Sequence, residues 1–145
     1  MYFVDRSKII ETVTYIDNHL DVLDKHRYDT RLEELALERM SHMIIEAILD
    51  TGNLMIDGFI MRDPGSYEDI IDILIDEKVI PEADETAYKE VIGLRKMLVN
   101  DYLTVEQAIL KETMQKHASV LKQFSTYIKT YLDNELGVAN AFSKE

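Results

Sequence analysis

The sequence predicts an all-α protein, an antiparallel bundle of about five helices, and composition and spacing both support this prediction. Of its 145 residues 46% are hydrophobic, and the chain has two prolines, five glycines and no tryptophan. Such a composition favours long helices over strands joined by turns. Apolar residues recur every three or four positions, and no segment shows the strict alternation of a strand. The length suits one domain, residues 1–145, with a substantial core.

Helix-capping residues divide the chain into these helices. Three hydroxyl residues precede an acidic or amide residue by three positions, as in a capping box: Thr30, Ser66 and Thr104. Asp5 or Ser7 could begin the first helix, and Pro81 suits the first turn of the fourth. The predicted helices are 6–27, 31–61, 67–79, 82–99 and 105–136.

Helix 31–61 has the broadest apolar surface of the five. The first and fifth helices each carry one apolar stripe, whereas apolar residues of helix 31–61 cover more than one: Ala36, Leu37, Met40, Met43, Ile44, Ala47, Ile48, Leu54 and Met55. Such a helix is either central in the bundle or buried on two sides, one of them against a second subunit. We therefore expect a two-fold symmetric dimer, with helix 31–61 or helix 82–99 at the interface close to Arg95.

Composition and spacing also exclude several classes of site. The chain has no cysteine, which rules out disulfides, thiolate metal sites and cysteine nucleophiles. No glutamate precedes a histidine by three positions, as a di-iron bundle requires, and no glycine-rich phosphate loop is present. We expect no metal and no cofactor, and we expect His117 at the surface or its boundary. Without a signal peptide or an apolar run of ~20 residues, the chain is expected to be cytoplasmic, with no membrane partner.

The net charge of -12 bears on possible partners. Non-specific binding of nucleic acid depends on lysine and arginine that neutralise phosphates, so the overall charge of this chain does not favour it. A local basic groove is still compatible with this net charge. The densest acidic segment is 63–85, whose only basic residue is Lys78. It is either a solvated helix face or a docking face for a basic partner.

A polar ribbon runs along helix 31–61 beside its apolar residues. Its members are spaced by three or four positions: Arg39, His42, Glu46, Asp50, Asn53 and Asp57. Asp50 lies between Ala47 and Leu54 on the helix face, and a carboxylate buried there needs a cation. Arg95 is the natural candidate. Two interpretations stay open: a solvated face with weak ion pairs, or a cleft in which His42, Glu46 or Asp50 supports the arginine.

The segment from Arg95 to Tyr102 contains the most informative pattern in the chain. It resembles the signature of the HepT-like branch of the HEPN superfamily, in which an arginine is followed four to six residues later by a histidine, then by one residue and a tyrosine. Arg95 and Tyr102 stand where the signature places its arginine and tyrosine. Asn100 replaces the histidine, and Lys96 stands where a small polar residue is usual.

Other segments resemble the same family in the expected order. Residues 38–40 (Glu-Arg-Met), then Glu46 and 50–53 (Asp-Thr-Gly-Asn), are similar to the pattern of its second helix. Residues 67–74 and 79–81 look like its short helix and exit. The resemblance therefore covers most of the chain.

The resemblance implies a fold similar to that of nucleotidyltransferase substrate-binding subunits and a homodimer whose paired motifs line a cleft at the interface. Active members are metal-independent ribonucleases that act as toxins, so RNA is an expected partner. A minimal nucleotidyltransferase is their antitoxin and modifies the motif tyrosine. Here the catalytic arginine would be Arg95, and the candidate modification site would be Tyr102.

The replacement of histidine by Asn100 bears directly on activity. Metal-free RNA cleavage needs a group that moves protons near neutral pH, which histidine does and asparagine does not. Arginine can stabilise the charge on the phosphate. Two interpretations follow: a ribonuclease toxin with impaired catalysis, or a non-catalytic HEPN module that binds RNA, a nucleotide or a nucleotidyltransferase partner.

Overall fold

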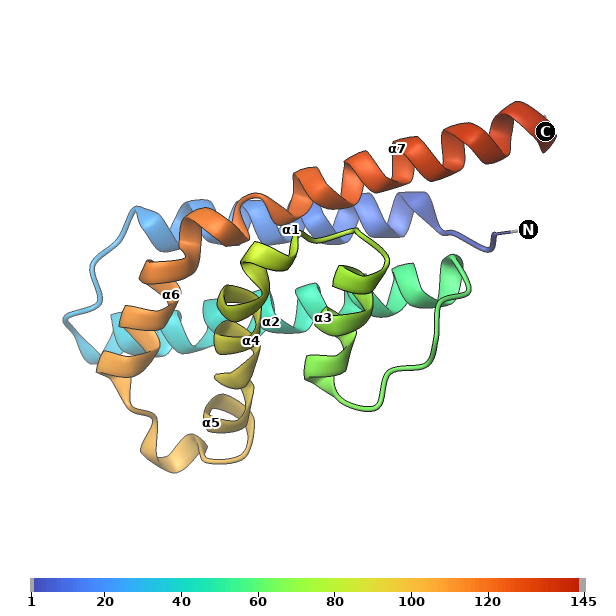
Figure 1. The fold of residues 1–145 in the computed structure, drawn as a ribbon. Coiled ribbons are helices and arrows are strands. Elements are labelled where there is room, and N and C mark those ends of the chain that lie inside the picture. The colour runs from blue at the N-terminus through green and yellow to red at the C-terminus, as the bar shows by residue number, and fades with distance from the viewer. Residues whose placement is uncertain (1, 144–145) are drawn as a thin grey trace.

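The computed structural model describes residues 2–143, with side chains described for 2–136, and that part of the chain contains helices and no strands (Figure 1). The elements are α1 (Arg6–Asp24), α2 (Arg31–Gly58), α3 (Tyr67–Asp76), the 3₁₀ turn η1 (Glu82–Asp84), α4 (Glu85–Gly93), α5 (Arg95–Val99), the 3₁₀ turn η2 (Tyr102–Thr104), α6 (Gln107–Leu121) and α7 (Phe124–Ser143). The all-α prediction is confirmed, and all five predicted helical regions are present. Over residues 2–143, no helix is long and apolar enough to cross a membrane.

Two predicted helices are broken into shorter ones. Helix 82–99 is divided at Leu94 between α4 and α5, and helix 105–136 is divided after Leu121 between α6 and α7. At the second break the Gln123 amide bonds to the Val120 carbonyl, a tighter turn than an α-helix makes. Figure 1 shows α6 and α7 meeting at a sharp bend. Because of this bend, α6 packs on α4 and α2 while α7 lies along α1.

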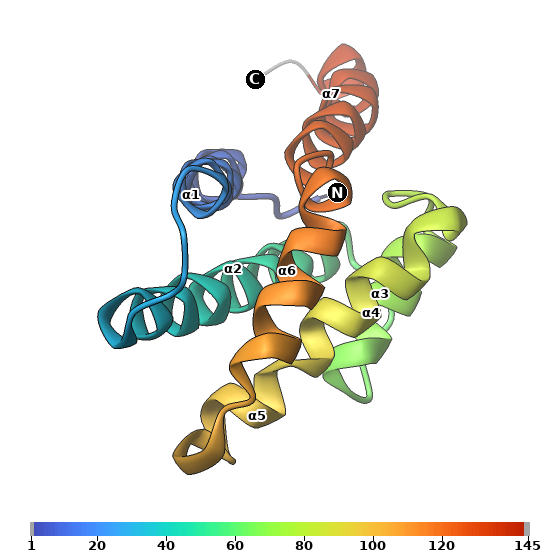
Figure 2. The same ribbon diagram turned by 90° about the vertical axis from the view of Figure 1, so that its left-hand side faces the viewer.

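The helix α2 is the centre of the fold. It contacts α1, α3, α5 and α6. Figure 2 shows α1 seen nearly along its axis, with α2 running below it. Large side chains of α2 fill the core: Leu37, Ile44, Ile45, Ile48, Leu49, Met55 and Ile56. A Cβ on Gly52 would lie 2.4 Å from Ile70 Cγ2, so this glycine lets α3 approach α2 closely. The breadth of the apolar surface on α2 therefore follows from its central position.

The observed helix starts confirm most of the capping predictions. Thr30 forms a complete capping box with Glu33, and the Ser66 hydroxyl accepts from the Asp69 amide. The Asp5 carboxylate accepts from the Lys8 amide, which makes it the cap of α1. The prediction for Thr104 is wrong: this residue belongs to η2, and α6 begins at Gln107 without a side-chain cap.

One prediction about a polar residue needs correction. His117 is buried rather than superficial, with 7% of its surface exposed, because α6 packs against α4 here. Its Nε2 lies 2.5 Å from Glu90 Oε2 of α4. This contact lowers the pKa of Glu90. In the acidic segment 63–85, several carboxylates are paired within the protein: Asp69 with Arg62, Asp72 and Glu85 with Lys89, and Asp84 with Tyr127. These pairs are compatible with a solvated face and with a docking face.

Candidate functional site

Arg95 is the first residue of α5, and its side chain contacts α2 and α3. Its Nε donates a hydrogen bond to Glu46 Oε1 of α2 at 2.6 Å, and its guanidinium carbon lies 4.5 Å from the ring centre of Tyr67 of α3. The break at Leu94 ends α4 directly before this arginine, and α5 packs against α2. The side chain is 23% exposed, so the guanidinium is held in place and still reachable from solvent.

The electrostatics of this pair suit an anion-binding group. The hydrogen bond with Glu46 raises the pKa of Arg95 further, so the guanidinium is always charged. The two terminal amino groups of Arg95 make no hydrogen bond to the described part of the protein. Because Glu46 engages only Nε, these amino groups are available to a phosphate oxygen, to which arginine binds strongly.

His42 approaches the same carboxylate from one helical turn earlier. Its Nε2 lies 3.7 Å from Glu46 Oε1, and its side chain is 29% exposed. A recess of about 230 Å³ opens beside it between α2 and α5, lined by Leu35, Glu38, Arg39, His42 and Leu98. The structure therefore brings His42, Glu46 and Arg95 together.

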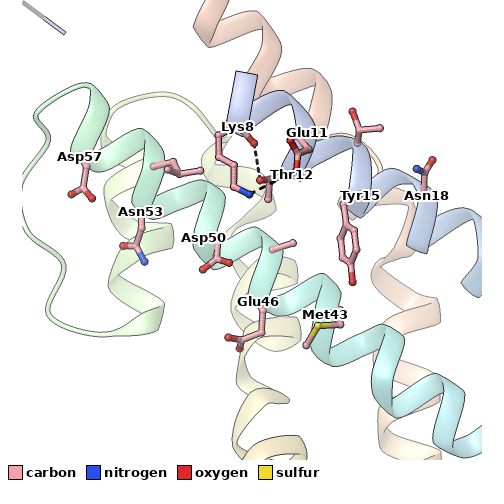
Figure 3. Close-up of a pocket in the computed structure, with 13 residues that line it drawn as sticks. Lys8, Glu11, Thr12, Tyr15, Asn18, Met43, Glu46, Asp50, Asn53 and Asp57 are labelled. Carbon is pink, nitrogen blue, oxygen red and sulfur yellow. Dashed lines mark hydrogen bonds and ion pairs between the residues drawn. The ribbon is translucent and has the colours of Figure 1, made fainter. Parts of the chain in front are cut away.

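Asp50 does not belong to this group. It is exposed, and it makes no ion pair with the residues that the structure describes. It lines a groove of about 730 Å³ between α1 and α2, with Asn53, Asp57 and Glu46 on the α2 side (Figure 3). The expectation that Asp50 is a buried partner of Arg95 is therefore wrong. One turn separates Asp50 from Glu46, and α5 contacts α2 at Glu46.

Asn100 stands at the end of α5 opposite to Arg95, and Tyr102 lies in the turn that follows. Asn100 caps the end of α5 and is exposed, and Tyr102 in η2 is 64% exposed. Both line a recess of about 680 Å³, to which Arg95 does not contribute. An ion pair of 2.9 Å between Lys96 and Asp101 bridges this turn. The structure therefore does not bring Arg95 into the recess that Asn100 and Tyr102 line.

Tyr67 is the part of the site that the sequence did not reveal. Its segment resembled the short helix of the family, but nothing in the pattern placed its ring against a guanidinium 28 positions further on. Over the described residues, no three histidine, aspartate or glutamate side chains are grouped so that they could hold a metal ion.

Comparisons with known proteins identify the family and the fold. A family model described as HepT-like ribonuclease matches residues 8–128. The candidate RNase YutE of Bacillus subtilis (strain 168) is 48% identical over 143 residues, which cover 98% of this chain and 99% of YutE. A solved structure of YutE, a cytosolic protein of unknown function from Bacillus subtilis, superimposes with a TM-score of 0.92 and covers 94% of this chain and 96% of that one.

A second solved structure shares the fold at lower identity. It is a crystal structure of a toxin–antitoxin with AMP-PNP, with a TM-score of 0.72 and 20% identity, covering 83% of this chain and 96% of that one. The family match spans the helices α2, α3 and α5 that hold Arg95, and the relative at 48% identity covers nearly the whole chain. The chain belongs to the HepT-like ribonuclease family.

Proposed function

We propose that this protein is a metal-independent endoribonuclease of the toxin type whose catalysis is impaired. Its family and the relative named as a candidate RNase support the reaction class. The observation that carries the proposal is the position of Arg95. Glu46 holds its Nε, and its terminal amino groups make no hydrogen bond to the described residues. The impairment rests on Asn100, which stands where the family has its histidine.

The chemistry of the site explains why its activity should be low. A guanidinium aimed at a phosphodiester stabilises the negative charge that builds up as the 2′-oxygen attacks phosphorus. Transfer of the 2′-hydroxyl proton contributes a further ~10²–10⁴-fold in rate when a suitable base is in place. Asn100 cannot exchange protons near neutral pH, so this contribution is missing from the family position.

RNA cleavage by the purified protein in the presence of a metal chelator tests this proposal. We expect slow cleavage by the wild type and none by Arg95→Ala. The matched control is Arg27→Ala, because Arg27 is an exposed arginine in the α1–α2 loop with only a surface ion pair to Asp29. Rapid cleavage that survives Arg95→Ala would place the reaction elsewhere.

The exposed amide at Asn100 also favours a second candidate, a non-catalytic HEPN module that binds RNA, a nucleotide or a nucleotidyltransferase. Asparagine can donate and accept hydrogen bonds, which suits recognition without reaction. Wild-type protein that binds RNA, depends on Arg95 for that binding and shows no cleavage would support this candidate over the ribonuclease.

We further propose a minimal nucleotidyltransferase as the antitoxin partner and Tyr102 as the residue it modifies. The solved toxin–antitoxin with AMP-PNP has the same fold, and AMP-PNP is an analogue of ATP. Tyr102 is 64% exposed, so its hydroxyl can attack the α-phosphate of a nucleotide and release pyrophosphate. Co-expression with a nucleotidyltransferase encoded beside the gene should add one nucleotide mass to wild type and to Tyr15→Phe. Tyr102→Phe should stay unmodified; modification of this variant would exclude the tyrosine.

A two-fold dimer is part of the proposal. Large apolar side chains are exposed on the first turns of α2 and on the η2–α6 segment: Leu32, Leu35, Leu103 and Ile109. A hydrogen bond from Gln107 to Glu38 ties these two segments together. Exposed apolar groups of this kind mark interfaces, and this one would adjoin the site. The cytosolic description of the YutE structure supports a cytoplasmic location.

A further inference from the structure

His42 lies near Arg95 in space although far from it in sequence. Glu46 Oε1 lies 2.6 Å from Arg95 Nε and 3.7 Å from His42 Nε2. Arg95 Nε and His42 Nε2 are therefore separated by no more than the sum of these two distances. The two side chains are therefore close enough to act on one phosphodiester, with the terminal amino groups of Arg95 at the phosphate oxygens and the imidazole at the ribose.

We propose that His42 is the catalytic residue that transfers the proton in place of the missing motif histidine. The proposal rests on the ribonuclease function inferred above and assigns its residual activity to one imidazole. Nδ1 of His42 makes no hydrogen bond to the part of the chain that the structure describes, and this nitrogen can accept a proton while Nε2 faces Glu46.

The surroundings of His42 fit an RNA backbone. The charged groups around it are Glu38, Arg39 and Glu46 of α2, and Arg95 of α5 through Glu46. Glu38 is occupied by Arg31 and Gln107, whereas Arg39 makes no ion pair with any described residue. Arg39 lies one turn before His42 on α2, and Glu46, which holds Arg95, lies one turn after it, so the two arginines can serve as cations for consecutive phosphates. In the same recess, Leu98 of α5 offers an apolar surface for a base.

The reaction follows from these positions. His42 Nδ1 takes the proton of the ribose 2′-hydroxyl, and the 2′-oxygen forms a bond to phosphorus. The bond from phosphorus to the 5′-oxygen breaks, and water protonates the leaving oxygen. The products are a 2′,3′-cyclic phosphate and a 5′-hydroxyl, and His42 returns its proton to solvent. Glu46 acts as a positioning residue, because it touches Arg95 and His42 rather than RNA.

The decisive test compares His42→Gln with the wild type over pH 5 to 8 in the presence of a chelator. Glutamine keeps a hydrogen-bonding side chain but carries no proton, so the cleavage rate should fall by ~10²-fold. The rise in rate with pH, which a histidine base produces across about pH 5 to 8, should disappear. His26→Gln is the matched control, since His26 is exposed in the α1–α2 loop. Circular dichroism and thermal melting check that each variant folds.

The outcomes separate this inference from the proposed function. If His42→Gln keeps the wild-type rate and pH profile while Asn100→His gains activity, His42 is not the base and the ribonuclease function stands. If neither the wild type nor Asn100→His cleaves RNA, the ribonuclease function and the role of His42 are both overturned. Cleavage products with a 3′-hydroxyl instead of a cyclic phosphate would also contradict the mechanism.

Discussion

At the scale of single residues, Glu46 is the side chain that organises the site. One of its oxygens serves both Arg95 and His42, so the carboxylate fixes the direction of the guanidinium and lies beside the imidazole. Its side chain is 32% exposed, so solvent reduces both the desolvation cost and the electrostatic attraction of the ion pair with Arg95. The contact serves to position groups more than to stabilise the fold.

Substitution at this position should therefore have a modest effect on stability. Glu46→Gln should lower the free energy of unfolding by about 1 kcal/mol, because it weakens a charged hydrogen bond that is only half-buried. The matched control is Asp50→Asn, one helical turn away and exposed, which should change it by less than ~0.5 kcal/mol. Urea unfolding measures both. An equal decrease in the free energy of unfolding of the two variants would show that the contact of Glu46 with Arg95 does not stabilise the fold.

A second residue-scale prediction concerns Asp69 and acid. Arg62 holds the pKa of this carboxyl at about 2, with help from the Gly65 amide. A pKa lowered by folding stabilises the protein above the usual aspartate range, and that stability is lost as pH falls from about 4 toward 2. The difference in the free energy of unfolding between wild type and Asp69→Asn should therefore decrease as the pH falls through this range. Asp63→Asn, at an exposed carboxylate, should show no such change in acid titrations followed by circular dichroism.

At the scale of helices, the sequence predicted those helix boundaries that depend on interactions within one turn. Capping residues such as Thr30 and Ser66 located two helix starts because their hydroxyls act within one turn. The bend after Leu121 could not be predicted, because the apolar stripe continues through it and the bend depends on α6 and α7 packing against different helices. For the same reason the sequence placed Glu46 and Asp50 on one ribbon but could not tell which of them α5 would meet.

The contact between α2 and α3 gives a prediction at this scale. Gly52→Ala should destabilise the protein by about 1–3 kcal/mol, because the added Cβ overlaps Ile70 and the two helices must shift. Gly93→Ala at the end of α4 meets nothing within 4 Å, and it should stabilise by about 0.4–1 kcal/mol. Thermal or urea unfolding distinguishes the two signs. A neutral Gly52→Ala would show that α3 is free to move away from α2.

At the scale of the whole molecule, charge opposes association while apolar exposure favours it. Each chain carries a net charge of -12, so two chains repel one another and salt should strengthen the proposed dimer. The interface would centre on the exposed end of the molecule formed by η2 and the first turns of α2 and α6. The fold class followed from composition and periodicity, whereas this surface depends on how three separate segments meet.

Sedimentation equilibrium tests the dimer. We expect twice the chain mass of 16.9 kDa at micromolar concentration, and a shift to the single mass for Leu103→Glu, whose side chain is 87% exposed. The control is Val22→Glu, at an apolar side chain of α1 that is 45% exposed, and it should leave the dimer intact. A wild-type protein that stays monomeric in high salt would contradict the proposed assembly.

The central claim is that the site keeps its arginine and lacks its family histidine, and one measurement addresses both halves. Metal-free RNA cleavage should rise by ~10²-fold in Asn100→His, because the added imidazole restores proton transfer at the family position. The gain should vanish when Arg95→Ala is added to that variant, since the phosphate loses its stabilising cation. Rapid cleavage by the wild type that persists after Arg95→Ala would contradict the account, because the reaction would then not depend on this site.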